Sequence, residues 1–159
     1  MNGHEYKKLV AQYLVKGYSS RGLRVYDEVN VGTSIIGKQR RIDLLVVEPE
    51  RRQALAVECK YQDSQGTADE KIPYTLQDLA ALRMPACVVY AGVGFSEGVL
   101  HLLQSSEFAA YCLPEGEFMP ISRRKGELNS GTWQLDHILA VTFGWWDILV
   151  EDKLPLRFD

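Results

Sequence analysis

Two neighbouring apolar segments with charged residues in their interiors constrain this chain more than any other feature. The segments span residues 40–47 and 54–62, and residues 49–52 between them (Pro-Glu-Arg-Arg) have the composition of a turn. This pattern predicts an antiparallel hairpin with a four-residue loop. Because an unpaired charge is costly in an apolar interior, the acidic and basic residues inside these strands need a specific reason to be there.

The expected register brings those residues onto one face. If no bulge intervenes, Asp43 faces Glu58 across the hairpin. Side chains alternate along a strand, so Lys60 and Gln62 share the face of Glu58. Two carboxylates in this position have Cβ atoms roughly 4.5–5.5 Å apart and repel each other unless a cation lies between them.

A divalent metal ion would remove this repulsion. Hard oxygen ligands, with no His pair or Cys pair nearby, favour Mg²⁺ or Mn²⁺ over Zn²⁺, and water and a substrate phosphate would complete the coordination. Lys60 would then lie beside the metal and could bind a phosphate oxygen or orient a water molecule. The alternative is a buried salt-bridge network of the same residues without chemistry.

The same residues resemble the PD-(D/E)xK nuclease superfamily. Asp43 is followed on the next strand by Glu58-Cys59-Lys60, and Gln62 extends the motif to ExKxQ, although Ile42 stands where the family's Pro would be. Residues 66–74 (Gly-Thr-Ala-Asp-Glu-Lys-Ile-Pro-Tyr) are also similar to the segment that follows the ExK strand in restriction-endonuclease-like members. The resemblance implies an α/β fold with a central mixed sheet flanked by helices, in the order αβββαβ.

The resemblance also implies roles for these residues. Asp43 and Glu58 would hold the metal, with the Cys59 backbone carbonyl as a further ligand, while Lys60 positions or deprotonates the attacking water and Gln62 supports the site. The implied activity is metal-dependent hydrolysis of phosphodiester bonds in DNA, by a restriction-like endonuclease. An RNA substrate and an inactive nucleic-acid-binding module remain alternatives. A homodimer would suit cleavage of both strands of a duplex.

The first helix offers one more ligand candidate. Its apolar residues recur with helical spacing and predict a buried stripe of Tyr6, Leu9, Val10, Tyr13, Leu14 and Gly17. In many relatives a Glu of this helix joins the metal site, and Glu5 is the positional match. Asn2 and Glu5 also have the spacing of a capping box, so a purely structural role is open. Glu28, on the strand expected at residues 24–31, is a weaker candidate.

Cations that could contact nucleic acid cluster despite the net charge of −3. Lys38, Arg40 and Arg41 directly precede the strand of Asp43 and are the best candidates. Lys71 and Tyr74 are candidates by resemblance alone. Two further clusters are Arg51-Arg52, expected to be a solvated turn, and Arg123-Arg124-Lys125, for which a substrate contact and a solvated loop are both open.

The remaining features indicate a single domain of 159 residues, with a core over about 2–113 and an elaboration over about 114–159. The three cysteines have no paired spacing and are expected to be reduced, and neither a signal peptide nor a membrane span is visible, so we expect a cytoplasmic protein without a membrane partner. Gly92, Gly94 and Gly98 weakly resemble a nucleotide-binding loop, but strand-to-helix turns need glycine anyway. We expect a helix at residues 133–141 and a strand at 144–150.

Overall fold

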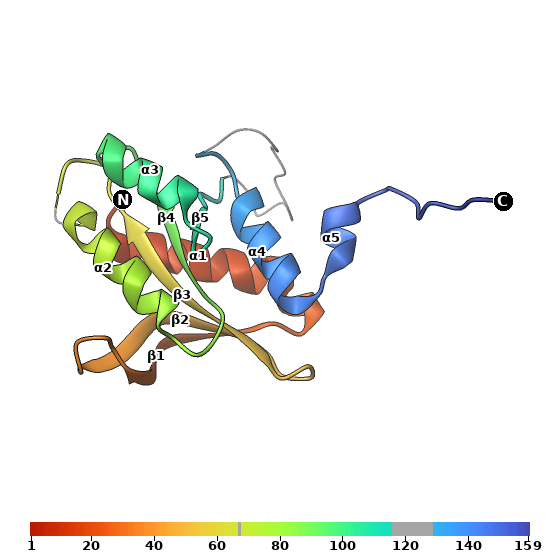
Figure 1. The fold of residues 1–159 in the computed structure, drawn as a ribbon, viewed down its shortest axis with the longest axis horizontal. Coiled ribbons are helices and arrows are strands. Elements are labelled where there is room, and N and C mark those ends of the chain that lie inside the picture. The colour runs from red at the N-terminus through yellow and green to blue at the C-terminus, as the bar shows by residue number, and fades with distance from the viewer. Residues whose placement is uncertain (67, 116–128) are drawn as a thin grey trace.

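The computed structural model describes residues 1–66, 68–115 and 129–159, and it places helices on both sides of a five-stranded sheet (Figure 1). Its elements are, in chain order, α1 (Gly3–Tyr18), η1 (Ser19–Arg21), β1 (Arg24–Thr33), β2 (Gln39–Glu48), β3 (Gln53–Tyr61), α2 (Ala68–Ala80), β4 (Ala86–Ala91), α3 (Glu97–Ser105), β5 (Ala109–Tyr111), α4 (Trp133–Phe143) and α5 (Trp146–Val150). This confirms the predicted α/β fold with a mixed sheet. The Arg123-Arg124-Lys125 cluster lies outside the described residues.

The sheet combines an antiparallel half with a parallel half. The strand order is β1-β2-β3-β4-β5; β1, β2 and β3 pair antiparallel, whereas β4 runs parallel to β3 and β5 parallel to β4. In the β2–β3 hairpin the register runs from Glu48 opposite Gln53 to Leu44 opposite Val57, as the sequence predicted. The hairpin leaves β3 in the centre of the sheet, so its residues are buried between two layers of helices.

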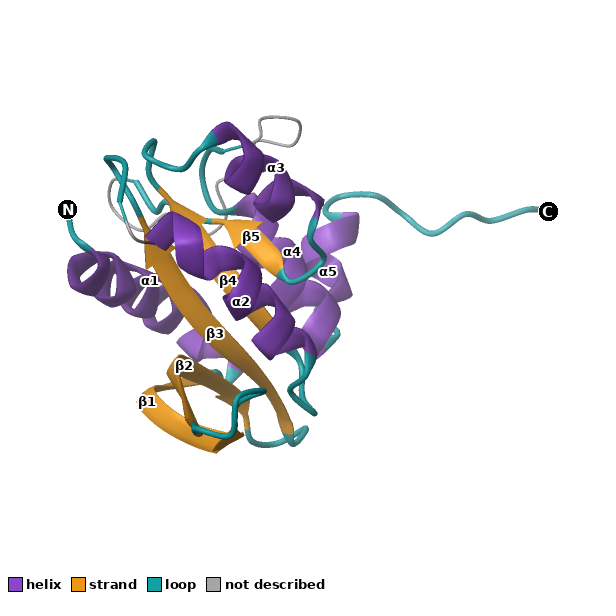
Figure 2. Cartoon of the chain, turned by 60° about the vertical axis from the view of Figure 1, so that its left-hand side comes forward, coloured by secondary structure: helices purple, strands orange, loops and turns teal. Residues whose placement is uncertain are grey.

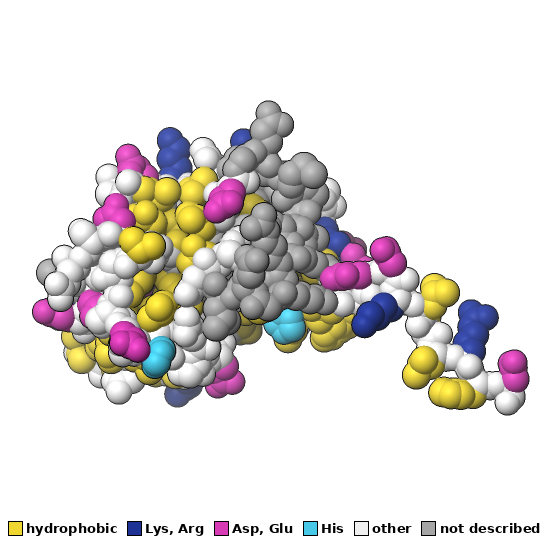
Figure 3. Space-filling view, turned by 90° about the horizontal axis from the view of Figure 1, so that it is seen from above, with side chains coloured by type: hydrophobic (Ala, Val, Ile, Leu, Met, Phe, Trp, Pro, Cys, Tyr) yellow, Lys and Arg dark blue, Asp and Glu magenta, His cyan; other side chains and the backbone are white. Residues whose placement is uncertain are grey.

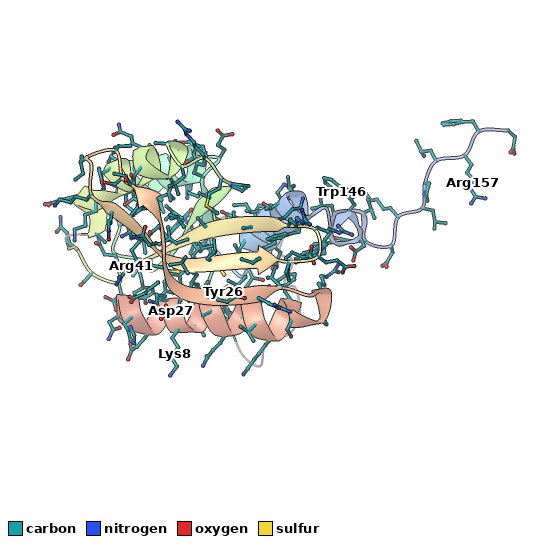
Figure 4. All side chains as sticks on the ribbon, turned by 90° about the horizontal axis from the view of Figure 1, so that it is seen from below. Lys8, Tyr26, Asp27, Arg41, Trp146 and Arg157 are labelled. Carbon is teal, nitrogen blue, oxygen red and sulfur yellow. The ribbon has the colours of Figure 1, made fainter. Side chains whose placement is uncertain are left out.

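Helices α1 and α2 cover opposite faces of the sheet (Figures 2 and 4). The predicted stripe of α1 is largely buried, and the Tyr6 hydroxyl donates a hydrogen bond of 2.6 Å to the Cys112 carbonyl beyond β5. Helix α4 packs on the same side as α1, because Asp136 of α4 accepts hydrogen bonds from the hydroxyls of Tyr13 (2.5 Å) and Tyr18 (2.6 Å). Asp136 is 1% exposed, so these hydrogen bonds lie in the core between the two helices and hold them together.

Residues 144–150 differ from the sequence prediction. They form the short helix α5 rather than a strand, after Gly144 ends α4 in the left-handed conformation (φ 72°). Trp145 is buried and stacks on Tyr18 and Phe143, and Ile148 three residues later is also buried, whereas Trp146 is 57% exposed. The buried residues therefore have the spacing of a helix. The apolar composition of this segment does not by itself distinguish a helix from a strand.

Helix α2 runs through Pro73 without interruption. Pro73 lies beyond the first four residues, whose amides lack helical partners, so its ring removes one i→i−4 hydrogen bond that the helix tolerates. All three cysteines are free and buried, and within the described part of the chain no helix is long and apolar enough to cross a membrane.

Candidate active site

Asp43 lies where β2 begins to separate from β3. The strand ladder extends to Leu44 opposite Val57, and one residue further the Asp43 Oδ2 accepts a hydrogen bond of 2.8 Å from the Cys59 amide. The carboxylate of Asp43 thus bonds to the backbone of β3 immediately after Glu58. This contact holds the two acidic residues side by side at the point that the register predicted.

Glu58 is the electrostatically unusual residue of the pair. Its side chain is 7% exposed, and burial, followed by the charge of Asp43 and a hydrogen bond with it, raises the pKa of Glu58 to about 8. The charges of Arg40 and Lys60 act in the opposite direction but do not restore an ordinary pKa. A buried carboxyl group with a raised pKa beside a second carboxylate is suited to receive a cation.

Arg40 belongs to this site as well, although the sequence indicated a contact with nucleic acid. Its guanidinium forms an ion pair with Glu58 Oε1 (3.2 Å) and a closer one with Asp78 of α2. Asp78 is 1% exposed and also accepts a hydrogen bond of 3.1 Å from the amide of Ile35, in the loop before β2. Asp78 had not been singled out, because nothing in the apolar spacing of α2 marks it as a partner of Arg40.

Gln62 supports the site through backbone contacts. Its Nε2 donates to the Gly94 carbonyl (2.9 Å), its Oε1 accepts from the Asp69 amide (3.2 Å), and its own carbonyl accepts from the Gly94 amide (2.8 Å). These bonds fix the end of β3 against the start of α2 and the loop after β4. The supporting role that the resemblance implied for Gln62 stays a prediction.

The same contacts explain two of the glycines that resembled a nucleotide-binding loop. A Cβ at Gly92 would lie 2.1 Å from the Gln62 carbonyl oxygen, and one at Gly94 would lie 2.5 Å from the Ser64 amide. Gly92 also has a φ of 104°, which favours glycine. Close backbone packing therefore accounts for both residues.

The structure places Glu5 and Glu28 in local interactions. Glu5 forms the complete capping box of α1, with Asn2 and Glu5 each accepting from the other's amide (2.9 and 2.8 Å). Glu28 pairs with Lys7 at 3.4 Å, and its side chain is 55% exposed. Over residues 1–66, 68–115 and 129–159, no group of three His, Cys, Asp or Glu side chains is arranged to hold a metal ion.

Two carboxylates nevertheless fit a magnesium-like ion. Mg²⁺ typically retains several water ligands and binds proteins through one or two carboxylates together with a substrate phosphate. Glu58 Oε1 is buried and, within the described residues, makes no hydrogen bond, having only the ion pair with Arg40. Asp43 and Glu58 are therefore the residues that would hold the ion, and the Cys59 carbonyl as a ligand stays a prediction.

The other predicted contacts surround this site on exposed surfaces. Lys38 and Arg41 are exposed at the start of β2, and Lys71 and Tyr74 are exposed on α2 (Figure 4 labels Arg41). Arg51, by contrast, donates to the Phe143 carbonyl at 2.9 Å and so has a structural role.

One comparison with known proteins gives a family match over most of the chain. A family profile described as a PD-(D/E)XK nuclease superfamily domain matches residues 2–146, which confirms the resemblance carried by Asp43, Glu58 and Lys60. No curated protein matches the chain. A crystal structure of a protein of unknown function, AF1548, is similar with a TM-score of 0.40 and 12% identity; the match covers 62% of this chain and 53%, about half, of that one.

Proposed function

The chain belongs to the PD-(D/E)XK nuclease superfamily, and on that premise we propose that it is a Mg²⁺-dependent endonuclease that hydrolyses phosphodiester bonds of DNA in the manner of restriction enzymes. The observation that supports this most is the contact of Asp43 with β3 beside Glu58, with Lys60 two residues further along. A divalent ion bound by the two carboxylates would supply charge neutralisation at the phosphate and activation of water. Mn²⁺ would serve as a substitute.

The protein's own side chains have distinct roles in this proposal. Asp43, whose carboxylate is held by the Cys59 amide, and Glu58 provide the carboxylate ligands for the ion. Lys60, as an ammonium, orients the attacking water and stabilises the negative charge that develops at the phosphate, since it can bind a phosphate oxygen as a point charge. Arg40, held by Asp78, forms an ion pair with Glu58 and favours its ionised form before substrate and ion arrive.

The test is cleavage of a supercoiled plasmid with Mg²⁺ or Mn²⁺. Asp43→Asn and Lys60→Ala should each lose at least about 100-fold in rate, the range expected for groups that act in proton transfer or charge stabilisation. Glu50→Gln, an exposed carboxylate in the turn of the same hairpin, is the matched control and should retain the wild-type rate. Equal cleavage by wild type and Asp43→Asn would contradict the proposed site.

Cleavage assays on other nucleic-acid substrates distinguish two alternative functions. A binding module without turnover would retain DNA on a filter but leave plasmid, linear duplex and single strands intact under every metal condition. An RNA-directed nuclease would cleave RNA in a manner that depends on the 2′-hydroxyl or on single-stranded loops. The intact set of Asp43, Glu58 and Lys60 favours turnover over the module.

A further inference from the structure

Residues 151–159, which we call the arm, carry an unusual exposed apolar pattern. The arm leaves α5 as an extended chain that projects away from the body (Figures 1 and 3). Leu154, Leu156 and Phe158 are 87%, 84% and 89% exposed. Because they alternate, they lie on one face of the extended chain, as the buried side of a strand would. Apolar side chains gathered in this way mark an interaction surface.

An unfilled groove of matching chemistry lies at the edge of the sheet. It has a volume of about 510 Å³ and runs between α1 and β1. We call it the α1–β1 groove; its apolar residues are Ala11 and Val15 of α1, Val25 of β1 and Leu44 of β2. β1 is an edge strand, with β2 as its only partner among the described strands. A strand added beside β1 would therefore direct alternate side chains into this groove.

We propose that the arm of one copy of this chain adds as a strand to β1 of a second copy, with Leu154, Leu156 and Phe158 in the α1–β1 groove. The arm points away from its own body, so it is placed to reach another molecule (Figure 2). If the arm of the second copy also adds to β1 of the first, the two copies form a closed two-fold dimer.

Backbone features of both partners fit this pairing. Pro155 has no N–H, but when Leu154 and Leu156 direct their amides to β1, Pro155 faces outward, where proline is tolerated. On the acceptor, residues 24–27 keep regular pairing with β2 before Glu28 adopts a φ of 48°. Val25, which lines the groove, lies in this regular stretch.

Charge favours the same occupant. The arm has three acidic residues and two basic ones, a net charge of −1, whereas the groove is lined by Lys7, Lys8 and Lys16 against Asp27 (Figure 4 labels Lys8 and Asp27). Trp146 and Val150, 57% and 50% exposed at the base of the arm, would extend the contact. A stable interface buries at least about 1,200 Å² in total, which two exchanged arms and the surfaces they cover would have to reach.

Cross-linking between copies tests the pairing directly. All three native cysteines are buried, so a Val15→Cys chain and a Leu156→Cys chain can each be labelled at one accessible thiol. When the two chains are mixed with a short bis-maleimide, the heterodimer should form at least about fivefold more than with Val141→Cys, an equally exposed residue of α4, in place of Val15→Cys. Equal yields would overturn the proposal.

Sedimentation of the full chain provides the second readout. Wild type should form a dimer, Leu156→Asp and Phe158→Asp should be monomers, and Arg157→Gln, on the other face of the arm, should remain a dimer. These residues are exposed in the single chain, so the variants should keep the wild-type fold, which circular dichroism checks. A wild-type monomer overturns the proposal. So does concentration-independent cross-linking within a single Val15→Cys/Leu156→Cys chain, which would assign the groove to the chain's own arm.

Discussion

At the scale of single residues, the buried carboxyl of Glu58 opposes folding whenever it is ionised. Its pKa rises from 4.5 to about 8 in the folded protein. Between these values the folded state holds a proton that the unfolded state releases, so the free energy of unfolding of the metal-free protein falls as pH rises from about 4.5 to 8 and then levels off.

Glu58→Gln should therefore stabilise the metal-free protein while abolishing cleavage. The amide cannot ionise, so at pH 8 the gain in free energy of unfolding should be on the order of 4 kcal/mol and should vanish below about pH 4.5. Urea denaturation with EDTA across this pH range measures it, with Glu50→Gln as the exposed control. A gain that is independent of pH would show that ionisation of Glu58 is not its cause.

Arg40 and Asp78 should behave as one buried unit. Arg40→Gln leaves Asp78, 1% exposed, without its cationic partner and should cost about 3–5 kcal/mol of stability. Adding Asp78→Asn removes the stranded charge while keeping an oxygen for the Ile35 amide, so the double variant should be more stable than Arg40→Gln alone. Denaturant unfolding of the four proteins gives the coupling energy, and strict additivity would contradict the ion pair.

The sequence predicted one of these residue pairs and not the other. Asp43 and Glu58 belong to one hairpin, where a turn and an alternation of side chains are enough to define the register. Arg40 and Asp78 lie on a strand and a helix that are separated in the chain, and only the packing of α2 on the sheet brings them together. Local patterns do not carry that information.

At the scale of elements, the ends of β3 and β4 depend on one close backbone contact. Gly92→Ala places a Cβ 2.1 Å from the Gln62 carbonyl oxygen at a φ of 104°, and should cost several kcal/mol and reduce cleavage by displacing Gln62. Gly98→Ala in α3 is the matched control. Among the described residues no atom lies within 4 Å of its new Cβ, so it should be neutral or stabilise by up to about 1 kcal/mol.

The prediction can fail in a specific way. Melting temperatures and plasmid cleavage of both variants decide it. If Gly98→Ala, and not Gly92→Ala, impaired function, the glycines would be acting in ligand binding rather than in packing.

Helices α1 and α4 are joined by the buried carboxylate of Asp136. Tyr13→Phe removes one donor, and since the acceptor is a carboxylate in the core, the loss should be about 1–3 kcal/mol with little change in cleavage rate. Tyr26→Phe, whose residue is 46% exposed, should change stability by less than about 0.5 kcal/mol. Equal effects in thermal unfolding would argue against the link.

Element prediction was strongest where the pattern was long. The periodic stripe of α1 and the alternation in the hairpin each involve many residues, and both elements form as predicted. Residues 144–150 are few and apolar throughout, so helix and strand were hard to distinguish, and the contacts of Trp145 with Tyr18 and Phe143 decided the outcome.

At the scale of the whole molecule, the proposed binding of DNA by a chain of net charge −3 would have to use local cations. Lys38, just before β2, and Arg41, in its first residues, are exposed and lie five and two residues before Asp43. If they contact phosphates, each neutralises one charge and releases a condensed counterion, which makes affinity fall more steeply with salt.

Lys38→Gln and Arg41→Gln should therefore weaken DNA binding and lower the slope of log affinity against log salt by about 1 each. Fluorescence anisotropy on an Asp43→Asn background measures binding without cleavage. Arg52→Gln removes the same charge from the exposed turn of the hairpin and is the matched control. If Arg52→Gln lowered the slope as much as Arg41→Gln does, the total charge of the protein, rather than the start of β2, would determine where DNA binds. A difference between them places the substrate beside the carboxylates that we propose cleave it.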